Sequence, residues 1–261
     1  MQKRLDVYLS ENNTVKSRSL AASLIKQGSV EVNGRICTKA SFAVDDNDNI
    51  RIIGEMPKYV GRGGLKLEKA LSHYRLHLDG SVCIDIGAST GGFTDCMLQN
   101  GAVKVYSVDV GTDQLDEKLR NDSRVVSMEK TDIRNCVGAL PAVDFIGIDV
   151  SFISLKLVLP SAYALLKDGG ECVALIKPQF EAGKSHLSKH GIVRDSKVHK
   201  KVCDDISEFA STLGFERGEV ISSPITGGDG NTEYLISQTF ITYNLQRQVK
   251  YHEGNDMCQS R

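Results

Sequence analysis

The sequence lacks an excess of charge of either sign, and it lacks a long apolar run. The 32 Lys and Arg residues nearly balance the 33 Asp and Glu residues, so the net charge is −1. A polyanionic partner therefore cannot be inferred from the total charge and must be sought in local clusters. The longest apolar candidate, residues 142–155, is interrupted by Asp144 and Asp149, whereas a membrane helix needs about 18 apolar residues. We expect no membrane-spanning segment and, because residues 1–6 have no apolar core, no signal peptide.

The sequence also lacks paired cysteines. Its seven cysteines include no C-x-x-C pair and their number is odd, which is typical of reduced thiols in a cytoplasmic protein. No internal repeat or low-complexity segment is present. The 261 residues are enough for one α/β domain of about 180 residues and a small additional module.

The most informative segment is residues 85–94, which read D-I-G-A-S-T-G-G-F-T and follow an apolar stretch. This order predicts a buried strand, a glycine loop and a helix whose first amides point outward as donors. Loops that bind dinucleotide phosphates read G-x-G-x-x-G, but here Asp85 precedes the first glycine and Ser89 replaces the second. An acid there repels a pyrophosphate and suits a cationic cofactor, S-adenosylmethionine. The alternative is a tight turn that needs glycine for conformational reasons alone.

Acidic residues follow the next predicted strands as well. Asp109, Asp132 and Asp149 come after stretches with the apolar pattern of buried strands. Such strands, separated by helices, predict a Rossmann-like α/β fold in which the carboxyl ends of parallel strands meet at one edge. Asp109 lies where the ribose hydroxyls of a nucleoside cofactor are usually held. The predicted cofactor-binding residues are Asp85, Gly87, Ser89, Thr90, Gly91, Gly92, Phe93, Asp109 and Asp132.

The first 57 residues form a different unit. An apolar rhythm over residues 17–28 predicts a helix, and the dipeptide Asn33-Gly34 between two short alternating stretches predicts a β-hairpin. Residues 1–42 hold seven Lys and Arg against three Asp and Glu, an excess of four positive charges. That excess suits an RNA backbone, and the alternative is a solvated helix face.

The segment after the fourth predicted strand excludes two kinds of RNA methylation. Enzymes that methylate exocyclic amines place an aromatic-proline motif such as D-P-P-Y there, and residues 149–152 read D-V-S-F. Enzymes that methylate carbon 5 of pyrimidines need a cysteine nucleophile, typically after proline, and no Pro-Cys pair occurs. Ribose methylation needs only a base for the 2′-hydroxyl, and a lysine serves if its pKa falls from about 10.4 towards about 7–8. Lys177 follows an apolar stretch and would emerge beside Asp149, although it could also be an ordinary surface lysine.

Two parts of the sequence each resemble a known protein family. Residues 17–34 resemble the small RNA-binding domain of the αL type, found first in a small-subunit ribosomal protein, through Ser17-Arg18, Leu24-Ile25 and Asn33-Gly34. From residue 59 onward the chain resembles the TlyA family of ribosomal RNA 2′-O-methyltransferases, often labelled haemolysins, whose catalytic half is like that of FtsJ ribose methyltransferases. The blocks are R-G-G-L-K-L at 62–67, the glycine loop at 85–95, D-V-S-F-I-S at 149–154, I-K-P-Q-F-E at 176–181 and G-N-T-E-Y at 230–234.

The resemblance implies S-adenosylmethionine-dependent methylation of a cytidine ribose in ribosomal RNA, with a catalytic set on Lys66, Asp149, Lys177 and Glu233. By itself Glu233 would be only a turn residue. Gly61 departs from the family pattern, in which we expect serine. The predicted boundaries are an αL-type RNA-binding domain at 1–57, a linker at 58–64, a Rossmann-like methyltransferase domain at 65–244 and a polar tail at 245–261.

A second basic stretch follows Lys177. Residues 182–202 hold six Lys and Arg against one Asp, so this stretch is predicted to grip an RNA backbone. His186 and His190 have a spacing seen in metal sites, but no carboxylate or cysteine completes a set, and we expect no metal. The predicted RNA-binding residues are Arg4, Arg18, Lys26, Lys184, Lys189 and Arg194.

Three functions of different classes remain open at this point. The first is an enzyme that methylates ribose in the RNA of ribosomal subunits. The second is a membrane-active haemolysin, which the common family label suggests and the lack of a membrane segment disfavours. The third is an RNA-binding assembly factor without catalysis, which the presence of two lysines and two acids in one cleft disfavours.

Overall fold

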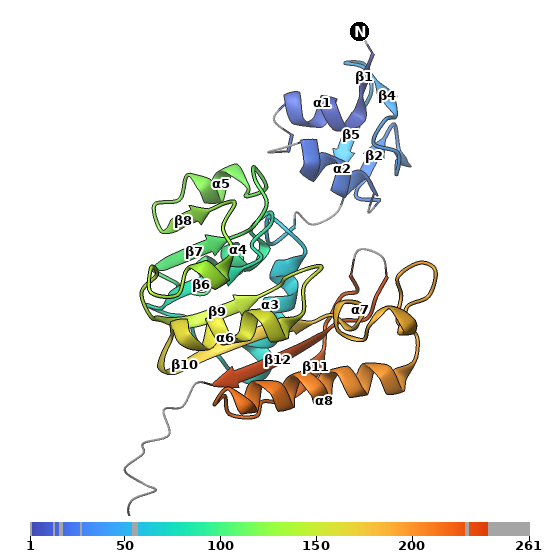
Figure 1. Ribbon diagram of the computed structural model, residues 1–261. Helices are drawn as coiled ribbons and strands as arrows, with labels where there is room; N and C mark the ends of the chain where they lie inside the picture. Colours follow the sequence, from blue (N-terminus) through green and yellow to red (C-terminus); the bar gives the residue numbers. More distant parts are fainter. Residues whose placement is uncertain are drawn as a thin grey trace, which may run out of the picture. The chain divides into compact units, whose positions relative to one another are not determined.

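The computed structural model describes residues 2–12, 14–15, 18–26, 28–53, 57–227 and 230–239. The chain divides into two compact units, Met1–Pro57 and Lys58–Arg261, which we describe one at a time (Figure 1). The predicted polar tail at 245–261 lies outside the described residues, as do the last residues of the predicted methyltransferase domain.

The N-terminal unit packs two helices against short antiparallel strands. Its elements are β1 (Lys3–Arg4), α1 (Leu5–Glu11), α2 (Arg18–Lys26), β2 (Val30–Val32), β3 (Arg35–Ile36), β4 (Ala43–Val44) and β5 (Ile50–Ile52). Strands β3, β2 and β5 form one sheet in that order, and β1 pairs with β4. Asn33 and Gly34 have φ values of 52° and 79°, the left-handed conformations that a two-residue hairpin of type I′ requires. The predicted hairpin is therefore confirmed, and an apolar core that includes Leu5, Leu24 and Val30 closes the unit.

The second unit is built on one seven-stranded sheet. Its elements are α3 (Gly63–Tyr74), β6 (Val82–Ile86), α4 (Gly92–Gln99), β7 (Lys104–Val108), α5 (Glu117–Arg120), β8 (Val125–Met128), η1 (Ile133–Asn135), β9 (Val143–Ile148), α6 (Leu155–Leu165), β10 (Leu166–Ile176), α7 (Pro178–Glu181), η2 (Lys184–His186), α8 (Ser196–Thr212), β11 (Val220–Ser222) and β12 (Tyr234–Thr239). The strand order is β11-β12-β10-β9-β6-β7-β8, and β6 to β10 run parallel. Strand β12 is antiparallel to both of its neighbours. The Rossmann-like α/β fold predicted from the sequence is confirmed.

Helices cover both faces of this sheet (Figure 1). Alternate residues of a strand enter different cores: Ile84 and Ile146 pack with α6 and α8, whereas Cys83 and Phe145 pack with α3 and α4. Because both faces are buried, the polar chemistry of such a sheet is concentrated at its carboxyl edge.

Residues 58–64 differ from the predicted linker. The ring of Tyr59 is buried in the core of α3 and α4, and the amide of Val60 donates a hydrogen bond to Asp95 Oδ2 at 2.9 Å. A side chain at Gly64 would collide with the Tyr59 ring, so glycine lets α3 pass directly over it. The chain divides after Pro57, as the predicted boundary has it, and the buried aromatic ring fixes the segment that follows to the second unit, in which α3 begins at Gly63.

Candidate active site

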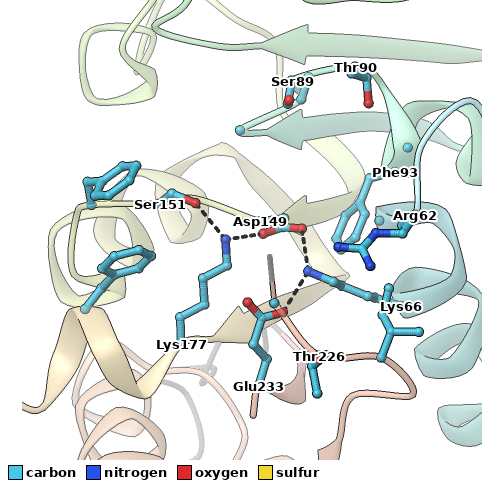
Figure 2. A pocket seen from close by; sticks show the side chains of 18 of the residues that line it. Arg62, Lys66, Ser89, Thr90, Phe93, Asp149, Ser151, Lys177, Thr226 and Glu233 are labelled. Atoms are coloured by element: carbon cyan, nitrogen blue, oxygen red, sulfur yellow. Dashed lines mark hydrogen bonds and ion pairs between the residues drawn. The ribbon is translucent and has the colours of Figure 1, made fainter. Parts of the chain in front are cut away.

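Two adjoining cavities lie at the carboxyl edge of the sheet. The first has a volume of about 340 Å³ and the second a volume of about 300 Å³. They share walls formed by Gly87, Ser89, Asp149, Ser151 and Phe152, so Asp149 stands at the boundary between them. Figure 2 shows the first cavity, into which the four residues of the predicted catalytic set project.

Each residue of that set occupies the end of an element. Lys66 lies in the first turn of α3, Asp149 directly follows β9, and Lys177 directly follows β10. Glu233 directly precedes β12, and because β12 is antiparallel to β10, the start of one strand lies beside the end of the other. Residues 167 positions apart in the chain, from Lys66 to Glu233, thus meet at one edge.

The four charged groups form an alternating chain of ion pairs (Figure 2). Glu233 Oε2 lies 2.7 Å from Lys66 Nζ, which lies 3.3 Å from Asp149 Oδ2. The other Asp149 oxygen lies 2.7 Å from Lys177 Nζ, and that ammonium donates a hydrogen bond of 2.9 Å to Ser151 Oγ. Both lysines are only 8% exposed, and such burial is tolerated because each ammonium is paired with a carboxylate. The structure therefore brings together all four predicted catalytic residues.

The glycine loop closes over this edge in a conformation that its sequence permits. Gly87 has a φ of 84°, and a Cβ there would lie 2.5 Å from the backbone oxygen of Asp149, so only glycine fits. The carboxylate of Asp109 accepts hydrogen bonds of 2.7 Å from the amides of Ser89 and Gly111. Asp109 thereby fixes the loop between the two cavities. Of the other predicted loop residues, Thr90, Gly92 and Phe93 line the first cavity, whereas a side chain at Gly91 would meet Leu115 and Leu119.

The second cavity has apolar walls and three acids, one of which is Asp149. Apolar side chains of Val108, Ile133 and Val158 line it together with Asp109 and Asp132. Asp132 is bonded to Arg134, whose guanidinium holds the pKa of that carboxyl below its usual range. An apolar slot with acids placed to accept hydrogen bonds has the chemistry of a nucleoside site.

Asp85 lies elsewhere than the sequence suggested. It sits one residue inside β6, is fully buried and belongs to the wall of neither cavity. Its Oδ2 accepts hydrogen bonds from the amide and the hydroxyl of Thr94, at 2.8 and 2.7 Å, so it anchors the first turn of α4. Burial raises the pKa of this carboxyl to about 7. Direct contact between Asp85 and a cofactor stays a prediction, and the geometry supports a role beneath the loop.

The predicted RNA-binding residues lie on exposed parts of each unit. Arg4 and Arg18 are half exposed and share the carboxylate of Asp6, and Lys26 is the exposed last residue of α2. In the second unit, Lys184, Lys189 and Arg194 are exposed between α7 and α8. Among the described residues no group of three or more His, Cys, Asp or Glu side chains could hold a metal ion.

Among the residues of the cavity walls that the predicted site left out, Ser151 and Phe152 line both cavities. Ser151 accepts the hydrogen bond from Lys177, and Phe152 is 90% exposed with a φ of 64°, an uncommon conformation for a non-glycine residue. The centroid of the Phe152 ring lies 5.0 Å from that of Phe180. The signal that could have found Phe152 is a large apolar residue three positions after the strand-end acid Asp149, in a loop where no core is available to bury it.

A Rossmann-like sheet with a glycine loop, a nucleoside-like cavity and an adjacent set of two lysines and two acids defines a methyltransferase. Residues 59–240 match the family model described as FtsJ-like methyltransferase, and residues 3–50 match the S4 domain. The chain therefore belongs to the FtsJ-like methyltransferase family and carries an S4 domain at its N-terminal side.

Similar proteins agree with this assignment over most of the chain. "Putative rRNA methyltransferase YqxC" of Bacillus subtilis is 47% identical over 240 residues, which cover 90% of this chain and 85% of that protein. The 16S/23S rRNA (cytidine-2'-O)-methyltransferase TlyA of Mycobacterium tuberculosis is 37% identical, covering 89% of this chain and 88% of that protein. A solved structure, "Putative hemolysin from Streptococcus thermophilus", is 41% identical with a TM-score of 0.73 and covers 98% of both chains. In the part of the chain that the structure describes, no helix is long and apolar enough to cross a membrane.

Proposed function

We propose that the protein transfers a methyl group from S-adenosylmethionine to the ribose 2′-hydroxyl of a cytidine in ribosomal RNA. The observation that carries this proposal is the side chain of Lys177, which lines the first cavity and is held there by Asp149 and Ser151, two residues that line both cavities. A base at that place can act on a hydroxyl in the first cavity that faces a methyl donor in the second. The nucleotide and the RNA are inferred from the activity named for the mycobacterial relative.

The residues of the second cavity fit S-adenosylmethionine. Its apolar walls suit an adenine, and Asp132 and Asp109 stand where ribose hydroxyls can donate to them. Each oxygen of Asp109 already accepts one loop amide, and a carboxylate oxygen has a second lone pair for a ribose hydroxyl. The cofactor supplies a methyl group bound to a sulfonium, and a cationic ligand is attracted by these acids. Ser89, Gly87 and Asp149 line this cavity too and would bound the methionine part.

In the proposed reaction, one charged residue removes the proton and the other three hold that residue in position. Lys177, as the neutral amine, accepts the proton of the 2′-hydroxyl while Asp149 and Ser151 fix the position of Nζ. Lys66 lies against the opposite oxygen of Asp149, and Glu233 fixes Lys66 in turn. These contacts hold the amine of Lys177 in one position, as efficient proton transfer requires.

RNA binding is supported by features outside the charged set. Phe152 offers an exposed aromatic face at the mouth of both cavities, on which an unstacked base can lie. The exposed cations between α7 and α8 and the S4 domain at residues 3–50 supply sites for backbone phosphates. An assembly factor without catalysis would not need two buried lysines, since burying paired charges costs free energy that packing of apolar residues avoids.

The test is methylation by two variants of Lys177. Lys177→Ala and Lys177→Arg should both reduce methyl transfer to ribosomal subunits at least about 100-fold, because a guanidinium cannot act as a base. Calorimetry with S-adenosylmethionine should give an affinity within a few-fold of the wild type. Asp109→Ala is the matched control and should lose cofactor affinity instead. An active Lys177→Arg enzyme would show that the base lies elsewhere, and binding of NAD in place of S-adenosylmethionine would exclude the proposed reaction.

A further inference from the structure

The backbone of Val193, in the segment before α8, is held by side chains on both sides. Its amide donates a hydrogen bond of 3.3 Å to Asn231 Oδ1, and its carbonyl accepts one of 2.9 Å from His199 Nε2. Asn231 Nδ2 donates a further bond of 3.2 Å to the carbonyl of Gly191. A carbonyl can only accept, so His199 carries a proton on Nε2, and Nδ1 of the neutral ring accepts from the hydroxyl of Tyr234 at 3.0 Å. These contacts join the segment before α8 to the start of β12.

The same contacts enclose Glu233. Asn231 lies two residues before it and Tyr234 one residue after it, so the two bonded side chains flank Glu233 in the chain. Asn231 is 3% exposed and His199 is 7% exposed. A buried carboxamide or imidazole left without partners costs free energy, so both side chains are confined to the geometry in which these bonds are made.

The position of Glu233 depends on a strand on one side and on a loop on the other. From Tyr234 onward the backbone pairs with β10 and β11, whereas the residues before Glu233 belong to the loop after β11. The carbonyl of Glu233 accepts a hydrogen bond of 2.9 Å from the amide of Ser223, and a Cβ at Gly227 would lie 2.7 Å from Glu233 Oε1, so this loop folds closely over the carboxylate. A displacement of the loop would change the separation of 2.7 Å between Glu233 Oε2 and Lys66 Nζ.

We propose that Asn231 and His199 are positioning residues for the methyl transfer: they fix the start of β12, and thereby Glu233 beside the ammonium of Lys66. This inference rests on the proposed function, because it adds two supporting residues to the set of four charged groups. The same two side chains also anchor one end of the segment with exposed cations, residues 184–194. A substitution can therefore change the rate or the affinity for RNA, and the two effects are measured separately.

The first test is the effect of Asn231→Ala on kcat and KM of the full-length protein with purified ribosomal subunits. We expect kcat to fall about ten-fold and KM to stay within about three-fold, because misplacement of Glu233 affects the reaction more than binding. Asn121→Ala, which alters an exposed asparagine outside both cavity walls, is the matched control and should keep both constants. A raised KM with unchanged kcat overturns the proposal, since Asn231 would then serve only the segment with the cations. Unchanged values of both constants overturn it as well.

The second test compares His199→Gln with His199→Leu. Glutamine can still donate a hydrogen bond to the carbonyl of Val193, whereas leucine occupies similar space without a donor. The leucine variant should lose about ten-fold in kcat, and the glutamine variant should recover to within about three-fold of the wild type. Equal kcat values for the two variants overturn the proposal. This pair also decides the outcome if Asn231→Ala does not fold.

A double mutant separates this inference from the proposed function. In the Glu233→Gln background, Asn231→Ala should cause no further loss of kcat, because both substitutions act on the same contact with Lys66. Losses that multiply overturn the proposal. Affinity for S-adenosylmethionine and thermal unfolding serve as checks of folding. A wild type without methyl transfer removes the proposed function and this inference with it, whereas an active wild type whose kcat survives Asn231→Ala removes the positioning role alone.

Discussion

At the scale of single residues, Asp85 shows how a strand-end acid can serve the fold and the site together. Its carboxylate is enclosed by the sheet and by the first turn of α4, and only Oδ2 has hydrogen-bond partners in the described structure. An ionised carboxylate in such a place costs free energy, which is why burial raises the pKa of Asp85 to about 7. The glycine loop is therefore anchored by a group that titrates near neutrality.

This titration predicts a pH dependence of stability. In the unfolded chain Asp85 ionises near pH 3.8, so the folded state binds its proton more tightly and loses stability as pH rises towards about 7. Between pH 5 and pH 8 the loss should be about 2–3 kcal/mol, and Asp85→Asn should remove it. Urea unfolding at both pH values measures the difference. Asp144→Asn on the neighbouring strand should keep the wild-type dependence, because Asp144 is held by Lys167 and stays ionised over this range.

At the scale of elements, the side chain of Glu181 joins the loop after β9 to α7, and both segments contribute to the wall of the first cavity. Glu181, the last residue of α7, accepts a hydrogen bond of 2.7 Å from the amide of Leu155 and one of 2.6 Å from the hydroxyl of Ser154. These two residues open α6, directly after the loop that carries Asp149 and Phe152. An acid at a helix N-terminus is also favoured by the helix dipole. Glu181 therefore holds the loop after β9 against α7, which follows Lys177.

Glu181→Gln tests this connection. An amide can accept only through one atom, so one of the two hydrogen bonds is lost and the stability should fall by about 1–2 kcal/mol. We expect kcat for ribosomal subunits to fall about ten-fold with little change in KM, since misplacement of Asp149 and Lys177 affects the reaction more than binding. Glu219→Gln, which alters an exposed acid paired with His73 in the last turn of α3, should retain full activity. Equal rates for both variants would mean that the loop is held without Glu181.

The sequence predicts the main helices and strands and the four charged residues. It does not predict how deeply an individual residue is buried. Alternating apolar residues predict which face of a strand is buried, and the family resemblance of the blocks around Lys66 and Glu233 implies which acids and lysines meet. Periodicity says nothing about how closely a helix covers a given strand residue, so Asp85 was expected in a cavity and lies beneath a helix. In the same way, a lone aromatic residue such as Tyr59 carries no period, and its burial follows from packing between distant segments.

At the scale of the whole molecule, the two units have separate cores, and we propose separate tasks for them. The N-terminal core and the two cores of the second unit share no residue. We assign RNA affinity to the N-terminal unit and the reaction to the second unit, since contacts with phosphates position an RNA without acting on it chemically. A cytoplasmic location and the identity of the modified nucleotide remain predictions.

Removal of residues 2–57 tests this division. The shortened protein should bind S-adenosylmethionine with nearly unchanged affinity and should lose methylation of ribosomal subunits, because most phosphate contacts are gone. The deletion must stop before Lys58, since Tyr59 belongs to the core of the second unit. A deletion that also removes Tyr59 is the comparison, and it should lower the melting temperature. Full methylation by the first deletion would transfer substrate recognition to the cations between α7 and α8.

The position of Glu233 just before β12 has a consequence for the protein as it is being made. Translation supplies Lys66, Asp149 and Lys177 in that order, and the parallel strands β6 to β10 are complete before Glu233 has been added. Strand β11 lies at the edge of the sheet and pairs with β12, so these two strands are added beside β10 together and bring Glu233 to Lys66. The chain therefore lacks its complete set of two lysines and two acids until this last pair of strands has been synthesised and has joined the sheet.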